Sequence, residues 1–198
     1  MACDITRGRL IDCKDTIGGL KAIYICKNYN NNISAVATIN TTEMTTAGFA
    51  TWSGQSGSAT TVFKYDLVPN LSSMTVNINS DNANGTAFFE QTLSVVLQKI
   101  DHDTTNELRL MAYSRAQIFV QDQNDNVFLL GMNNGCHVTG GTVITGTAMG
   151  DQNGYTIEWG AQEKNALIQL PASAGPATAK YPFDGLADEA DLTITVGT

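Results

Sequence analysis

The residues that most often perform covalent chemistry are few in this chain and are poorly spaced for it. Nucleophilic catalysis needs a Ser, Thr or Cys beside a base, and the only histidines are His102 and His137. Cys136 directly precedes His137, and consecutive residues of a strand point to opposite faces, so this pair does not predict a catalytic dyad. His102 stands between Asp101 and Asp103, where an exposed, solvated side chain is expected.

Metal binding is weakly indicated, and no cofactor is expected. Residues 122–126 (DQNDN) place oxygen-bearing side chains at alternate positions, as calcium loops do. Val127 stands where that motif needs Gly and Asn133 where it needs Glu, so a hairpin turn is the simpler interpretation and weak calcium binding the alternative. A zinc site needs paired ligand spacings, which the cysteines lack; reduced, buried thiols are expected at Cys3, Cys13, Cys26 and Cys136.

The remaining chemical motifs also give little support for an enzyme. The chain has no GxxxxGK[ST] phosphate loop, and Gly146, Gly150 and Gly154 are expected to form turns. Glu158 and Glu163 could lie at glycosidase distance in some folds, but their spacing alone does not establish it. We therefore expect a non-enzymatic protein.

Charge is low in amount and uneven along the chain. The formal net charge is −8, with a balance of +2 over residues 1–64 and −10 over the rest. Such a chain repels phosphates, which disfavours ordinary nucleic-acid binding. No run of ~18 apolar residues is present, and the first residues lack the apolar stretch of a secretory signal. Folding in a cytoplasm, without membrane partners, is expected.

Residue periodicity predicts a mainly β fold of one domain. Residues 22–26 form an apolar run typical of a buried strand, and residues 86–100 alternate clearly, with Leu93 and Val95 on one side. From Asp103 to Ser114 the period becomes helical, with Thr104 to Glu107 as a possible capping box. Further strands are predicted at residues 33–39, 61–67, 73–79, 116–121, 127–131, 137–145, 154–159, 165–170 and 192–196.

Residues 40–61 lack any sustained period and predict a long loop or arm within a domain of residues 1–170. Structureless loops of this length are usually functional or disordered. Phe49 and Trp52 need a surface to bury them, which a neighbouring subunit or the chain's own domain could equally supply. Residues 171–198 are predicted to be a small-residue linker followed by a short apolar element.

The order of elements over residues 86–170 is a long strand, a short helix, a hairpin and a closing pair of strands around GTAMGDQNGYTIEWGAQEKNALIQL. This order resembles the tail tube proteins of long-tailed phages and the related tube subunits of contractile injection systems. The opening MACDITRGRLIDCKDTIGGLKAIYI is also similar to openings of phage structural proteins.

The resemblance implies an antiparallel β-sandwich or partial barrel with one short flanking helix. It implies homohexameric rings that stack into a virion tail tube, assembled in the host bacterial cytoplasm together with other tail proteins, through which DNA passes without specific binding. The expected inter-subunit contacts are Thr45, Thr46, Phe49 and Trp52. The expected lumen-facing acids are Asp122, Asp125, Asp151 and Glu158.

Three alternatives share this composition. The acidity could serve solubility alone. Another virion protein, such as a head decoration or tail-terminator protein, would have a similar sequence without polymerising into tubes. A β-sandwich module for carbohydrate would use Trp52 and Trp159 in a stacking platform.

Overall fold

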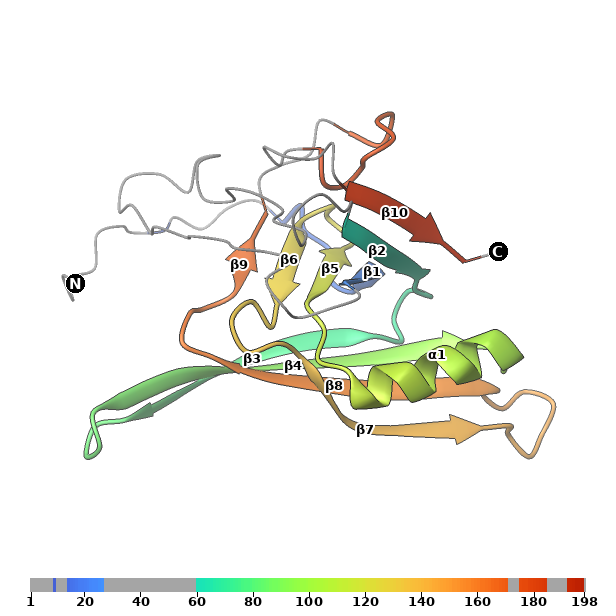
Figure 1. Ribbon diagram of the computed structural model, residues 1–198, viewed down its shortest axis with the longest axis horizontal. Helices are drawn as coiled ribbons and strands as arrows, with labels where there is room; N and C mark the ends of the chain where they lie inside the picture. The colour runs from blue at the N-terminus through green and yellow to red at the C-terminus, as the bar shows by residue number, and fades with distance from the viewer. Residues whose placement is uncertain (1–8, 10–13, 27–59, 171–174, 185–191, 198) are drawn as a thin grey trace.

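A computed structural model describes the fold of the protein over most of its length (Figure 1). The described residues are 9, 14–26, 60–170, 175–184 and 192–197. The strand predicted at residues 33–39 lies outside them. The predicted arm at residues 40–61 also lies outside them, except for Thr60 and Thr61, which begin a strand.

The described residues form ten strands and one helix. The strands are β1 Leu20–Cys26, β2 Thr60–Asp66, β3 Ser73–Asp81, β4 Thr86–Gln98, β5 Ile118–Asp122, β6 Val127–Leu130, β7 His137–Ile144, β8 Gly154–Glu163, β9 Ile168–Gln169 and β10 Leu192–Val196. The helix is α1, His102–Tyr113. The prediction of a mainly β, sandwich-like fold with one short helix is confirmed.

Two sheets make up the fold. One has six strands in the order β10-β2-β1-β5-β6-β9, and the other has four in the order β3-β4-β8-β7. Every pairing is antiparallel except that of β10 with β2, which is parallel. Figure 1 shows the four-stranded sheet as a long layer beneath the six-stranded one.

The main core lies between the two sheets. Ile23 and Val120 of the six-stranded sheet belong to one apolar cluster with Leu93, Val95 and Ile157 of the four-stranded sheet. These side chains alternate along their strands with residues that point the other way. The alternation predicted for residues 86–100 therefore marks the side of β4 that faces the six-stranded sheet.

A second apolar cluster covers the other face of the six-stranded sheet. Tyr24 and Phe119 face Phe183, which is 0% exposed, with ring centroids 5.1 and 5.0 Å away in edge-to-face geometry. Leu192 at the start of β10 is also fully buried in this cluster. Because β1 is covered on both sides, its sequence is a continuous apolar run rather than an alternating one.

Helix α1 connects the two sheets and packs at the edge of the main core through Leu108 and Met111. Its N-cap is Asp101, whose carboxylate accepts the N–H groups of Asp103 and Thr104 at 3.2 and 3.4 Å. The helix thus begins before the predicted capping box at Thr104, because Asp101 already satisfies the first free N–H groups.

We expect Phe183→Ala to lower the free energy of unfolding by about 3–5 kcal/mol, because truncation leaves a cavity between Tyr24 and Phe119. Urea denaturation followed by far-UV circular dichroism measures the change. Val196→Ala, at a side chain that is 55% exposed in the neighbouring β10, is the control and should change stability little. A loss below about 1 kcal/mol for Phe183→Ala would contradict the packing of this segment.

Candidate functional site

The four-stranded sheet has one face in the core and one face that no described residue covers. Thr75, Thr92, Gly160 and His137 lie opposite one another in a row across its four strands, so they share a face. Leu93 and the other core residues of β4 alternate with this row and point inward. The face away from the core is called the outer face here.

The outer face is polar and carries acids without Lys or Arg. Its charged residues are Asp81, Glu90 and Glu158. Lys99 and Lys164 lie just past the ends of β4 and β8. By pairing and alternation, the other members of the outer face are Ser73, Thr75, Asn77, Asn79, Thr86, Phe88, Thr92, Ser94, Val96, Gln98, His137, Gly140, Thr142, Ile144, Gly154, Thr156, Gly160 and Gln162.

Both edges of this sheet are unpaired among the described residues, since β3 pairs with β4 alone and β7 with β8 alone. The edge strands read SMTVNINSD and HVTGGTVI, in which Asp81 at the end of β3 is the one formal charge. Isolated sheets usually protect such edges with Lys, Pro or other charged residues, because bare edges recruit further strands. These two edges therefore fit pairing with another chain.

The two edges are staggered along the strand direction. Thr75 of β3 and His137, the first residue of β7, lie in the same row across the sheet. Beyond this row β7 has no residues, whereas β3 continues for six residues to Asp81. In the opposite direction, Ser73, the first residue of β3, lies in the same row as Gly140 of β7. Beyond this row β3 has no residues, whereas β7 continues for four residues to Ile144. In Figure 1 the β3–β4 hairpin extends to one side of the molecule and the β7–β8 hairpin to the other.

The four acids expected to face a lumen lie in three different places. Glu158 is exposed on the outer face, opposite Gly140. Asp151 lies in the β7–β8 turn, where its carboxylate accepts the N–H groups of Thr147 and Ala148 at 2.8 and 2.7 Å. Those hydrogen bonds hold the pKa of Asp151 below its usual value.

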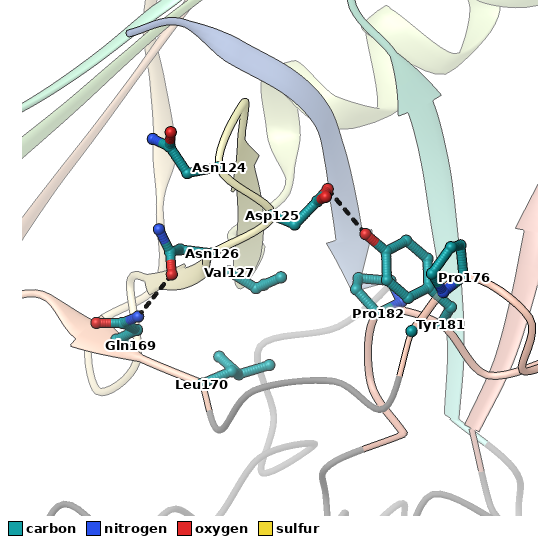
Figure 2. Close-up of a pocket in the computed structure, with 10 residues that line it drawn as sticks. Asn124, Asp125, Asn126, Val127, Gln169, Leu170, Pro176, Tyr181 and Pro182 are labelled. Carbon is teal, nitrogen blue, oxygen red and sulfur yellow. Dashed lines mark hydrogen bonds between the residues drawn. The ribbon is translucent and has the colours of Figure 1, made fainter. Parts of the chain in front are cut away.

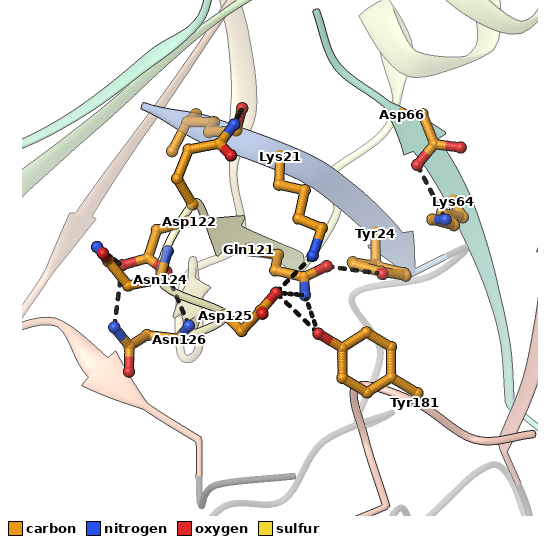
Figure 3. Close-up of polar contacts among 12 residues, drawn as sticks. Lys21, Tyr24, Lys64, Asp66, Gln121, Asp122, Asn124, Asp125, Asn126 and Tyr181 are labelled. Atoms are coloured by element: carbon orange, nitrogen blue, oxygen red, sulfur yellow. Dashed lines mark hydrogen bonds and ion pairs between the residues drawn. The ribbon is translucent and has the colours of Figure 1, made fainter. Parts of the chain in front are cut away.

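Asp122 ends β5 of the other sheet, and Asp125 lies in the turn between β5 and β6 (Figure 3). Asp122 Oδ1 accepts the N–H groups of Asn124 and Asn126 at 2.9 and 2.7 Å, so it closes the hairpin as the sequence predicts. A search of the described residues finds no group of three or more His, Cys, Asp or Glu side chains that could hold a metal ion.

Asp125 is the centre of a polar cluster (Figure 3). The cluster links β1, the β5–β6 turn and residues 175–184, which are called the C-terminal segment here. Its Oδ1 accepts hydrogen bonds from Lys21 Nζ at 2.6 Å, Tyr181 Oη at 2.8 Å and Gln121 Nε2 at 3.0 Å. The Lys21 hydrogen bond contributes most to holding the pKa of Asp125 below its usual value, and the same bond raises the pKa of Lys21. Burial chiefly raises the pKa of Tyr181.

A hollow of about 250 Å³ lies beside this cluster, between the β5–β6 turn and the C-terminal segment (Figure 2). Among the described residues that line it, the one carboxylate is that of Asp125, which already binds Tyr181 and Lys21. Asn126 and Gln169 bind each other across it at 3.0 Å. Its polar groups are thus engaged within the protein, and their arrangement is that of a structural junction.

The described thiols are buried, whereas the described imidazoles are exposed. Cys136 is buried and His137 is exposed, so the two side chains point to opposite sides, as predicted. Cys26 is also a free, buried thiol, and burial raises its pKa to about 12. Cys3 and Cys13 lie outside the described residues. His102 is exposed in the first turn of α1.

The carboxylates and tryptophan considered for carbohydrate chemistry do not converge. Glu158 and Glu163 lie on opposite faces of β8, because they are five positions apart along a strand. Glu163 is buried and accepts the N–H groups of Asn133 and Asn134 at 2.9 and 2.8 Å. Trp159 is 3% exposed within the main core, so it presents no open stacking surface.

The expected inter-subunit residues Thr45, Thr46, Phe49 and Trp52 lie outside the described residues. Two acids of the outer face, Asp81 and Glu90, were not among the residues predicted from the sequence. The alternation of β3 and β4 contains the signal for them, because both lie out of phase with the apolar residues of their strands.

Comparison with family models, curated proteins and solved structures finds no match to this chain. In the part of the chain that the structure describes, no helix has the length and hydrophobicity to span a bilayer.

We expect Lys21→Gln to raise the pKa of Asp125 toward the ordinary aspartate value of about 3.9, because the strongest donor to its carboxylate loses its charge. Carboxyl-carbon NMR during a pH titration measures the shift. The lowered pKa of Asp125 stabilises the fold above about pH 4, and this contribution is lost as the carboxylate is protonated. The variant should therefore lose less stability on acidification than the unsubstituted protein does. An unchanged Asp125 titration would contradict the ion pair.

Proposed function

We propose that this chain is a structural subunit of a phage tail tube, with copies forming hexameric rings that stack around a DNA-conducting channel. The observation that carries the proposal is the four-stranded sheet with an acidic, polar outer face and two edges that no other described strand pairs with. The element order that resembles tail tube proteins supports the same function. The protein would act in the virion tail, with itself and other tail proteins as partners, after assembly in the host bacterial cytoplasm.

The chemistry of the outer face suits the wall of a channel for DNA. Asp81, Glu90 and Glu158 repel phosphates, and no Lys or Arg on the face attracts them. The remaining side chains are mostly small and polar, so they offer few apolar surfaces on which bases could stack. Such a wall lets DNA slide without being held.

Stacking of rings would use the segment that carries Thr45, Thr46, Phe49 and Trp52. Its two ends are joined to neighbouring strands at one end of the six-stranded sheet, because Cys26 pairs with Val62 just after Thr60. A segment leaving the subunit at one end of a sheet can contact a ring above or below it. Its large aromatic residues would be buried by that contact.

We expect the purified protein to form six-fold rings and hollow tubes as its concentration rises, because identical copies would satisfy the bare edges of one another. Negative-stain electron microscopy and analytical ultracentrifugation measure the assembly. Rings that never lengthen would favour a tail-terminator role. Monomers that persist at high concentration would exclude the tube.

We expect the double variant Glu90→Lys with Glu158→Lys, once assembled, to retain duplex DNA at about 50 mM salt and to release it at about 200 mM, because the lining then pairs with phosphates. Filter binding with labelled DNA measures retention, and the unsubstituted assembly should retain none. Asp15→Lys with Glu107→Lys, at exposed positions outside the outer face, makes the same change in net charge. Equal retention by this control would place the channel wall elsewhere.

A further inference from the structure

Three Asn–Gly pairs occur in the chain, at residues 84–85, 134–135 and 153–154. In such a pair the backbone nitrogen of Gly can attack the side-chain carbonyl carbon of Asn, because Gly has no Cβ to obstruct the approach. The attack closes a five-membered imide ring, which requires a nitrogen whose N–H is not hydrogen-bonded and a backbone that is free to rotate. The sequence does not distinguish the three pairs, whereas the structure gives them different surroundings.

Hydrogen bonds hold Asn134 and Gly135 in place. The N–H of Gly135 donates to the carbonyl oxygen of Gly131 at 3.0 Å. The N–H of Asn134 donates to Glu163 Oε1 at 2.8 Å, and its side-chain amide donates to the carbonyl oxygen of Gln162 at 2.6 Å. The attacking nitrogen and the side chain under attack are both engaged, so this pair can react only after the loop opens locally.

Strand pairing holds Asn153 and Gly154. Gly154 begins β8, which lies between β4 and β7. A Cβ at Gly154 would lie 2.1 Å from the carbonyl oxygen of Leu97, so the backbones of β4 and β8 are in close contact at this point. The carbonyl oxygen of Asn153 also accepts the N–H of Lys99 at 2.8 Å. The rotation that ring closure needs would break these contacts, so this pair is protected as well.

Asn84 and Gly85 lie in the turn at the far end of the β3–β4 hairpin, away from the six-stranded sheet (Figure 1). Both residues are exposed. Among the described residues, no atom accepts a hydrogen bond from the N–H of Gly85. Apart from its chain neighbours, no heavy atom lies within 4 Å of the position that a Cβ of Gly85 would take. The attacking nitrogen of this pair is therefore free and its surroundings are open.

The neighbour of Asn84 in this turn is Asp81. Asn84 Nδ2 donates a hydrogen bond to Asp81 Oδ2, while Oδ1 of the same carboxylate accepts the N–H groups of Ala83 and Asn84 at 2.8 and 3.4 Å. The bond from Ala83 contributes most to holding the pKa of Asp81 below its usual value, and the Asn84 amide comes next. A carboxylate at residue 84 has no proton to donate, so it would replace this hydrogen bond with a contact between like charges.

We propose that Asn84 is a site of spontaneous conversion to aspartate and isoaspartate in the folded protein, and that the conversion turns its hydrogen bond with Asp81 into a repulsion. The nitrogen of Gly85 bonds to Cγ of Asn84 and loses its proton, and the side-chain nitrogen leaves as ammonia. Water then adds to one of the two imide carbonyl carbons, and the C–N bond at that carbon breaks. One water is consumed and one ammonia released, without an oxidant or a reductant.

The two products differ in where the ring opens. Opening at the side-chain carbonyl gives aspartate, and opening at the main-chain carbonyl gives isoaspartate, in which the backbone runs through the former side chain. Either product adds one negative charge beside Asp81 at the tip of the hairpin. The conversion needs only the folded chain and water, so it does not depend on the proposed function.

Peptide mapping by mass spectrometry tests the proposal. The purified full chain is stored at mildly alkaline pH in water enriched in heavy oxygen, which labels each residue that converts, and fragmentation of the peptides locates the label. Asn84 should convert about tenfold faster than Asn134 and Asn153, or more, because those two must first open locally. Similar rates at the three residues in the folded chain would overturn the proposal.

Two controls separate the effect of the fold from that of the sequence. In concentrated urea the three Asn–Gly pairs should convert at similar rates, because no structure protects any of them. Asn84→Gln should remove the label from the turn of the folded chain, because the longer side chain closes a ring less readily. Label that stays in the turn of this variant, or an Asn84 that also converts fastest in urea, would contradict the assignment.

Asn84→Asp tests the contact with Asp81. The variant should raise the pKa of Asp81, because its carboxylate loses a donor and gains a like charge. Carboxyl-carbon NMR during a pH titration measures the shift. Asn82→Asp is the matched control, since it adds the same charge to the same turn without removing a hydrogen bond that Asp81 accepts. An equal rise in both variants would overturn the predicted repulsion at residue 84.

Discussion

Apolar contact between the two sheets is the interaction on which the rest of the structure depends. Ile23 and Val120 of the six-stranded sheet bury one side of β4 and β8, including Leu93 and Ile157. This contact buries only one side of the four-stranded sheet. The other side therefore needs no apolar residues and can be polar and acidic. The same division lets the β3–β4 and β7–β8 hairpins extend past the core, since each is held by its inner rows.

Local periodicity was sufficient to predict the helix and the described strands, but not the order of the strands in the two sheets. Alternation around Leu93 located β4, and the change of period near Asp103 located α1, because both signals depend on neighbours in the sequence. The helix start was harder to predict, since Asp101 and Thr104 are both good N-cap residues. The role of Phe183 could not be predicted, because its partners Tyr24 and Phe119 are brought to it by pairing between distant segments.

The candidate site was predictable only in part, for a related reason. Composition indicates an acid-rich second half, but it does not say which acids are free. Asp122 and Asp151 close turns, and Asp125 is paired with Lys21, whereas Glu158 is exposed on the open sheet. The field at the outer face therefore depends on a few carboxylates and on the absence of cations there, more than on the total charge.

The position of Phe183 also has a consequence for the timing of folding during synthesis. The strands of the four-stranded sheet are translated before Phe183 and Leu192, which complete the cover over β1. Pairings of such long sequence separation form slowly, so a nascent chain on the ribosome exposes the aromatic side chains of Tyr24 and Phe119 until they are covered. In a crowded polysome, those unfinished chains are the species most in need of chaperones.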